Sequence, residues 1–376
     1  MKGRVGRVLA EALPALALLG VGDFLAGLYL GSHSKTLAAV PGLLTLLPVI
    51  MGLRGNIFSI MSAKASTILH VEGLAGLKSS GMRKTVGSLL LSMSVLPLVS
   101  VLLAHLYYES VGQGTVDLEG VIFVVYSSAV VMFPIILLFL LAITIMGFRF
   151  GMDPDHYGIP LIMGFADVLA IVFMTHFATL GRLPLWSTLL LPLAMLIVSL
   201  LLGVKAQVLK AAMLAQVLAI LLDLVAGVIL EKNLEVISRH LGLLVVLPLV
   251  NSELGGIGGI LASKYSTGLN LGFLEPRLAP TRSHIRYLSA AVILGALLFS
   301  LLSVLIAILG DVPLAAHLFL TALGTAISVV AWVLTHSITI FSYKHGLDPD
   351  LLSPPTITGT MDVLGTLMIL FISLSC

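Results

Sequence analysis

The sequence predicts an all-α polytopic membrane protein with about eleven transmembrane helices, arranged as two parallel five-helix repeats joined by a linker helix. Of its 376 residues 59% are hydrophobic and only 10% are charged, whereas a soluble domain carries about 25% charged residues. Apolar runs of roughly 20 residues, long enough to span about 30 Å of hydrocarbon, recur along almost the whole chain. Eight of the ten aspartates also fall into four pairs that match between the two halves.

Eleven apolar segments are long enough to cross a membrane. They lie at about 8–31, 37–62, 85–107, 120–146, 157–179, 184–204, 208–230, 237–262, 286–309, 313–340 and 352–374. The basic start and the apolar run after it resemble a signal peptide. That run is long and contains Asp23, however, so we expect it to be the first span. The single cysteine, Cys376, gives no disulfide framework and no thiol metal cluster.

Lysines and arginines lie mainly on one side of these spans, which orients the chain because cytoplasmic loops carry the excess of basic residues. With the N-terminus in the cytoplasm and the C-terminus outside, the inner segments hold fifteen of them. The outer segments hold only Lys35, Arg182, Lys232 and Arg239, and Arg54 lies inside a span. We therefore expect an integral protein of the plasma membrane, surrounded by lipid. Its net charge of +2 gives no reason to expect nucleic acid as a partner.

The second half of the chain repeats the first. Residues 151–177 align without gaps on residues 346–372 at a shift of 195, with the shared pattern D-P-D-x4-P-x3-G-x2-D-V-L. Residues 48–69 align on residues 248–269 at a shift of 200, with the shared pattern P-x6-G-x-I-x2-I-x3-K-x-S-T. Leucine matches between apolar helices mean little, so the aspartates are the better test. Their four pairs are Asp23/Asp223, Asp153/Asp348, Asp155/Asp350 and Asp167/Asp362.

Five spans per repeat is an odd number, so a direct fusion would insert the second repeat upside down. The span at 184–204 belongs to neither repeat and returns the chain to the cytoplasm. Both repeats then share one orientation, related by an axis along the membrane normal. We therefore expect a first repeat at 1–182, a linker helix at 183–206 and a second repeat at 207–376, so that a monomer suffices as a pseudo-dimer.

Asp167 and Asp362 lie about mid-span in the fifth helix of each repeat. A carboxylate there costs roughly 2.5–3.5 kcal/mol on insertion scales. Symmetry allows the two side chains to face each other across the axis, where they would repel or share a proton unless a cation lies between them. Mg²⁺ suits such a place, because it keeps most of its water and takes one or two carboxylates. The alternative is a protonated aspartate that hydrogen-bonds a neighbouring helix.

Prolines and glycines precede both aspartates, at Pro160/Pro355 and Gly164/Gly359. Each proline frees a carbonyl one turn back, which could join the oxygen ligands or simply accompany a packing kink. Asp153 and Asp348 open the same helices on the cytoplasmic side, each directly before a proline. They fit helix caps, and they equally fit a role in attracting cations at the inner mouth.

The second helix of each repeat carries polar residues among glycines. These are Asn56 in the first repeat and Asn251 and Glu253 in the second. Glu253 has no acidic counterpart, since Leu53 aligns with it and Arg54 follows, so the site need not be symmetric. We expect Arg54 to neutralise an intramembrane aspartate such as Asp23. The aligned first-helix residues Asp23 and Asp223 are themselves further candidate metal ligands.

These motifs resemble the MgtE family of magnesium channels, and the doubled arrangement is most similar to its tandem-domain members, the solute carrier family 41 type. The resemblance covers essentially the whole chain. It implies that Asp167 and Asp362 hold a central hydrated Mg²⁺, that Asp153 and Asp348 lie at the inner mouth, and that Asn56 and Asn251 are the asparagines of the second helices. The family often has asparagine before the fifth-helix proline, where this chain has Ile159 and Pro354. The 376 residues include no counterpart of the cytoplasmic sensor domains of the bacterial channels, so we do not expect their magnesium-sensing gate here.

The expected function is therefore transmembrane transport of Mg²⁺ or a related divalent cation between the two halves, without enzyme activity. Transport as a channel and exchange coupled to Na⁺ or H⁺ both fit the sequence. Gly20, Gly22 and Asp23 also form the GxGD of intramembrane aspartyl proteases. The second repeat lacks both glycines, at Ile220 and Leu222, so a protease is the remote alternative.

Overall fold

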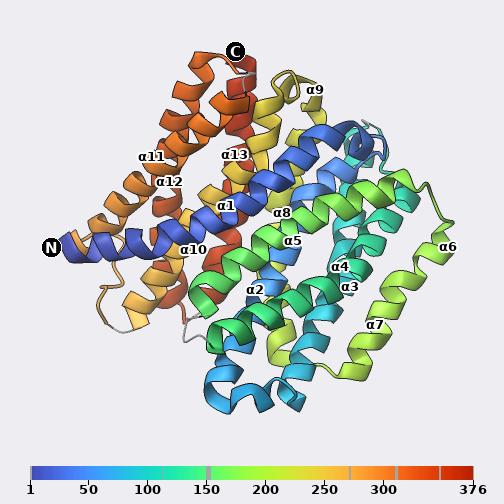
Figure 1. The fold of residues 1–376 in the computed structure, drawn as a ribbon, viewed down its shortest axis with the longest axis horizontal. Helices are drawn as coiled ribbons and strands as arrows, with labels where there is room; N and C mark the ends of the chain where they lie inside the picture. The colour runs from blue at the N-terminus through green and yellow to red at the C-terminus, as the bar shows by residue number, and fades with distance from the viewer. Residues whose placement is uncertain are drawn as a thin grey trace. The chain divides into compact units, whose positions relative to one another are not determined.

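The structure is a computed structural model that describes residues 2–112, 114–149, 154–270, 272–309, 312–346 and 349–375. Within these ranges it consists of helices and their connections, with no strand (Figure 1). The helices are α1 (Lys2–Ala38), α2 (Leu43–Gly76), α3 (Ser80–Val111), α4 (Leu118–Arg149), α5 (Pro154–Thr179), α6 (Leu185–Thr188), α7 (Leu190–Leu202), α8 (Ala206–Lys232), α9 (Leu234–Ile237), α10 (Leu241–Asn270), α11 (Arg282–Leu309), α12 (Leu314–Lys344) and α13 (Pro349–Ser375).

The prediction of an all-α polytopic membrane protein is confirmed. Ten helical segments of the described chain are long and apolar enough to cross a membrane, and they match ten of the predicted spans. The linker at 184–204 appears as α6 and α7, which together form one of these segments, Leu185–Leu202. The eleventh predicted span, at about 208–230, coincides with α8, a helix of 27 residues.

The two fifth helices, α5 and α13, begin at Pro154 and Pro349. Proline suits this first helical position because its missing N–H would have no intrahelical partner there. Both helices then continue through their internal prolines, Pro160 in α5 and the pair Pro354 and Pro355 in α13. The mid-span aspartates therefore lie on continuous helices.

The described helices divide into two compact units, and each is considered by itself below. The first-repeat unit comprises residues 32–220, and the second-repeat unit comprises residues 1–31 together with 221–376. The N-terminal helix up to Gly31 thus packs with the helices of the second repeat. Conversely, α8 contributes its residues up to Ile220 to the first-repeat unit.

In the first-repeat unit α2 is the central helix and packs against α3, α4 and α5. The linker helix α7 lies along α3. This contact is close because Gly87 faces backbone, and a Cβ on it would overlap the carbonyl oxygen of Gly203. The Lys205 N–H also donates to the Ser88 hydroxyl at 2.7 Å, which fixes the end of the linker against α3.

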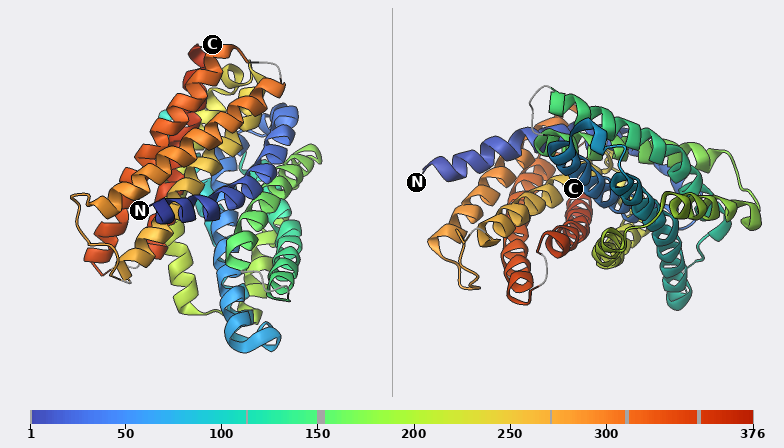
Figure 2. Two further views of the ribbon diagram at one scale, coloured as in Figure 1. Left: turned by 60° about the vertical axis from the view of Figure 1, so that its left-hand side comes forward. Right: turned by 90° about the horizontal axis from the view of Figure 1, so that it is seen from below.

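In the second-repeat unit α10 packs against α11, α12 and α13, and α11 and α12 run side by side in Figures 1 and 2. Helix α1 lies on α10 through Gly27 and Gly31, one turn apart. A Cβ on Gly27 would overlap the carbonyl oxygen of Val245. Small residues spaced by four let two membrane helices approach this closely, and van der Waals contact then stabilises the pair.

Two equivalent contacts show that the first helix of each repeat packs against the second helix of the other. In the second-repeat unit Leu16 of α1 contacts Gly256 of α10. In the first-repeat unit Gln216 of α8 accepts a hydrogen bond from Asn56 of α2, at 3.3 Å. At the shift of 200, Leu16 corresponds to Gln216 and Gly256 to Asn56. Each repeat thus packs its first helix on the second helix of the other repeat, an arrangement that we call the exchange of first helices. The contact is apolar between Leu16 and Gly256 and polar between Gln216 and Asn56.

Candidate functional site

Asp167 lies on α5 of the first-repeat unit, with 7% of its surface exposed. Arg54 of α2 is 1% exposed, and its positive charge interacts with the Asp167 carboxylate. All three guanidinium nitrogens of Arg54 lack a hydrogen-bond partner in the described residues. The attraction therefore acts through space, without a direct hydrogen bond from Arg54. The sequence led us to expect that Arg54 neutralises an intramembrane aspartate such as Asp23, and within the first-repeat unit Asp167 is an aspartate whose charge interacts with that of Arg54.

Asp362, the counterpart of Asp167, has a different neighbour in the second-repeat unit. It is half-buried on α13, and its carboxyl group hydrogen-bonds to that of Asp223 on α8. Asp223 is 2% exposed, and its Oδ1 has no hydrogen-bond partner in the described part of the chain. Gly359 makes room for this pair, since a Cβ on it would lie 3.1 Å from that Oδ1. Of the two fifth-helix aspartates, Asp167 thus interacts with the positively charged side chain of Arg54, and Asp362 interacts with the carboxyl group of Asp223.

Glu253 and Asp23 lie where α1 meets α10, in the same unit. Glu253 is 2% exposed and Asp23 is fully buried. The Oε1 of Glu253 would lie 2.9 Å from a Cβ on Gly20, three residues before Asp23 on the same face of α1. The Oε2 of Glu253 has no hydrogen-bond partner among the described residues. The two carboxyl groups therefore belong to one buried interface.

The two candidate asparagines have different surroundings. Asn251 on α10 reaches α13, where its Nδ2 donates to Thr366 at 3.4 Å. Thr366 in turn donates to the backbone oxygen of Asp362, so Asn251 lies one turn from the acid pair. Its Oδ1 has no hydrogen-bond partner in the described ranges. Asn56, by contrast, is bonded to Gln216 and serves the packing of α2 on α8.

Asp153 and Asp348, the predicted residues of the inner mouth, lie outside the described residues. Among the residues that are described, no three histidine, cysteine or acidic side chains come together as a metal cluster. The described candidate ligands are instead an acid pair, Asp223 and Asp362, with the amide of Asn251 one turn away. Glu253 lies on another face of α10. An arrangement with two carboxyl groups fits an ion that keeps most of its water.

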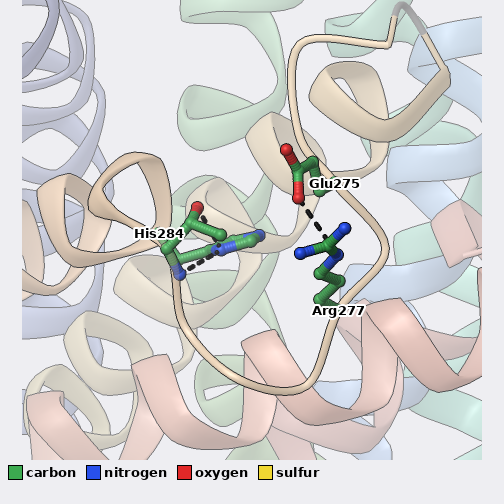
Figure 3. A network of polar contacts seen from close by, with 4 residues as sticks. Glu275, Arg277 and His284 are labelled. Carbon is green, nitrogen blue, oxygen red and sulfur yellow. Dashed lines mark hydrogen bonds and ion pairs between the residues drawn. The ribbon is translucent and has the colours of Figure 1, made fainter.

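The second-repeat unit has another polar cluster, around the loop before α11. Figure 3 shows Glu275 and Arg277 on the loop before α11, paired at 3.1 Å, with His284 at the start of that helix. His284 Nδ1 accepts the Thr281 N–H at 2.9 Å, and its ring contacts the ring of His336. These contacts fix the loop against α11 and α12, which indicates a structural role.

Sequence reasoning found the charged residues but missed their partners. The acid pair joins α8 and α13, the first and fifth helices of the second repeat, and its two aspartates are 139 residues apart in the sequence. Gln216 carried the clearest overlooked signal, because an amide within an apolar helix needs a hydrogen-bonding partner. Thr366 carried none, since threonine hydroxyls in membrane helices commonly bond to their own backbone.

Comparison with known proteins gives the chain a family. The family model MgtE, described as a divalent cation transporter, matches it twice, at residues 47–177 and 247–372. Each match begins within the second helix of a repeat and ends within its fifth helix. No solved structure matches the chain.

Curated proteins similar to the chain share low identity over nearly its full length. Solute carrier family 41 member 3 of Mus musculus is 26% identical, over 93% of this chain and 78% of the relative. Member 2 of the same family is 22% identical in Gallus gallus, over 96% of this chain and 69% of the relative. Member 2 of Homo sapiens is 23% identical, over 97% of this chain and 70% of the relative. The two family-model matches together cover more than half of the chain, and it therefore belongs to the MgtE family of divalent cation transporters.

Proposed function

We propose that this protein carries Mg²⁺ across the membrane along a pathway lined by the fifth helices of the two repeats, and that the Asp223–Asp362 acid pair is its main cation site. Asp167 contributes the second fifth-helix carboxylate by repeat symmetry. Asn251 supplies an amide oxygen near the acid pair. Glu253 on α10, Asp23 on α1 and Asn56 on α2 are further candidate ligands. Asp153 and Asp348 attract cations at the inner mouth. One chain supplies both halves of the pathway.

The observation that carries this proposal is the acid pair, in which Asp223 is buried and Asp362 is half-buried. Two carboxyl groups that meet in a low-dielectric interior either share a proton or bind a cation. The orphaned oxygens of the second-repeat unit strengthen the argument. Asp223 Oδ1, Asn251 Oδ1 and Glu253 Oε2 are all buried acceptors without hydrogen-bond partners in the described residues. Acceptors of this kind stabilise a cation or the water around it.

The chemistry of these ligands favours Mg²⁺ over softer metals. All of the proposed ligands are oxygens, which suit Mg²⁺, Ca²⁺ and Mn²⁺, whereas thiolates and imidazoles suit zinc and copper. Mg²⁺ gives up its water reluctantly and commonly binds through one or two carboxylates. The Asp223–Asp362 pair offers that number, and the amide of Asn251 lies where it could bond to a coordinated water.

The protein reconstituted into liposomes tests the proposal directly. With a Mg²⁺ indicator inside, the wild-type chain should admit Mg²⁺ faster than protein-free liposomes do. Imposed Na⁺ and H⁺ gradients then distinguish the mechanisms. A channel follows the Mg²⁺ gradient alone, whereas an exchanger accelerates with the gradient of its coupling ion. Mg²⁺ entry no faster than into protein-free liposomes under all three conditions would refute the proposal.

A further inference from the structure

Arg54 is a buried charge in a surrounding that offers little to stabilise it. It lines a cavity of about 10 Å³, the size of about one water molecule. The other lining residues are apolar: Ile50, Leu53, Met93, Pro97, Val125 and Ala129. None of the Arg54 nitrogens has a hydrogen-bond partner in the described residues. A charge buried in this way is retained only where a counter-charge compensates it.

Asp167 supplies that counter-charge. Its carboxylate attracts the Arg54 guanidinium, and solvent screens this attraction little because the two residues are only 7% and 1% exposed. The register of α2 on α5 supports the pairing. Gly55, next to Arg54, faces Met163, one turn before Asp167. The Ser59 hydroxyl also lies 3.5 Å from the Met163 sulfur, so α2 and α5 run past each other with Arg54 near Asp167.

The second repeat offers an internal comparison, because its helices make the same contact without the arginine. Gly255 faces Thr358 there, as Gly55 faces Met163. The position of Arg54 is taken by Leu254, and Asp362 is hydrogen-bonded to Asp223 instead. The two repeats therefore hold their fifth-helix aspartates in opposite electrostatic surroundings.

We infer that Arg54 is a built-in counter-cation that competes with the transported divalent cation for the Asp167 carboxylate and so sets the affinity of the pathway. This inference rests on the proposed function and adds a determinant of affinity to it. While Arg54 compensates Asp167, a divalent ion approaching that carboxylate meets a fixed positive charge. The ion is then held mainly at Asp362 and Asp223. Arg54 keeps the affinity moderate, which favours release of the ion.

The substitution Arg54→Leu copies the residue of the second repeat and tests the inference. Removing a like charge from a low-dielectric site should tighten Mg²⁺ binding by about tenfold or more, measured by calorimetry on the full chain in detergent. Arg54→Lys keeps the charge and should change the affinity much less. The matched control is Arg83→Leu, because Arg83 is exposed on α3 of the same unit. It removes the same charge far from the pair, and affinity should stay at the wild-type value.

The outcomes separate the two claims. If the wild-type chain neither binds nor transports Mg²⁺, the proposed function is wrong. If the wild-type chain binds Mg²⁺ and a folded Arg54→Leu binds it equally well or more weakly, the inference is wrong.

A double variant covers the case in which Arg54→Leu is unstable. Arg54→Leu combined with Asp167→Asn removes both charges, so it should restore the thermal unfolding midpoint toward the wild-type value. A double variant as unstable as Arg54→Leu alone would mean that Arg54 acts through packing, and would overturn the inference.

Discussion

Several buried polar residues near the proposed site differ between the two repeats. Among the described residues, Arg54 and Gln216 of the first-repeat unit have buried nitrogens without hydrogen-bond partners, whereas Asp223, Asn251 and Glu253 of the second-repeat unit have buried oxygens without them. Positive groups repel a divalent cation, and free acceptors attract it. We therefore expect the ion to bind closer to the second repeat.

Glu253 and Asn56 test this asymmetry, because both are polar residues of a second helix. Glu253→Gln removes a buried carboxylate whose Oε2 has no described hydrogen-bond partner, so it should weaken Mg²⁺ binding about tenfold or more. Asn56→Ala removes an amide already bonded to Gln216, so it should change binding much less. Calorimetric titration of both variants measures the difference. Equal losses of affinity would show that the asymmetry concerns packing alone.

At this scale the sequence predicted which residues matter better than it predicted their partners. Duplication identified Asp23, Asp167, Asp223 and Asp362, because only polar residues are informative in so apolar a chain. The pairing of Asp223 with Asp362 was missed. It depends on how a first helix passes a fifth helix, and no local pattern encodes that crossing. The link between Arg54 and Asp167 has the same origin in helix packing.

At the scale of the helices, the exchange of first helices positions the site. Helix α1 belongs to the second-repeat unit, and α8 carries both Gln216 and Asp223. The predicted spans located the helices themselves, since length and hydropathy decide where a chain can cross a membrane. Which helix packs on which depends on small contacts such as Leu16 on Gly256. Leucine and glycine are too common in this chain for that contact to be recognised in advance.

Gly27 and Gly259 provide a matched test of the α1–α10 contact. Both are helical glycines of the second-repeat unit, but a Cβ would overlap the Val245 carbonyl oxygen at Gly27 and would meet nothing within 4 Å at Gly259. Gly27→Ala should therefore destabilise the protein by about 1–3 kcal/mol, and Gly259→Ala should leave its stability close to wild type. Thermal unfolding in detergent measures both. Equal unfolding midpoints for the two variants would show that α1 does not pack on α10 through Gly27.

At the scale of the whole chain, the distribution of basic residues predicts the orientation, with the C-terminus outside. The single cysteine, Cys376, is a natural probe of this prediction. A membrane-impermeant maleimide should label the wild-type chain in intact cells. The control variant carries Cys376→Ser together with Lys78→Cys in the exposed connection between α2 and α3. It should be labelled only after the cells are opened. The reverse labelling pattern would show that the chain has the opposite orientation in the membrane.

The same orientation argument predicts that the two repeats are parallel. Helices α1 to α5 should superpose on α8, α10, α11, α12 and α13 by rotation about the membrane normal. The equivalent contacts of Leu16 with Gly256 and of Gln216 with Asn56 agree with this correspondence. An experimental structure in which the repeats are related by an axis in the membrane plane would contradict it.

The central claim is that the acid pair of the second repeat binds the transported cation. Mg²⁺ flux into liposomes tests this claim most directly. Asp362→Asn removes one charge of the pair while keeping its shape. Asp117→Asn is the control, because Asp117 belongs to the first-repeat unit, where it caps α4 and pairs with Arg182 at 2.9 Å. We expect Asp362→Asn to slow Mg²⁺ flux by about tenfold or more, and Asp117→Asn to transport at nearly the wild-type rate. A folded Asp362→Asn protein that transports Mg²⁺ as fast as wild type would contradict the account.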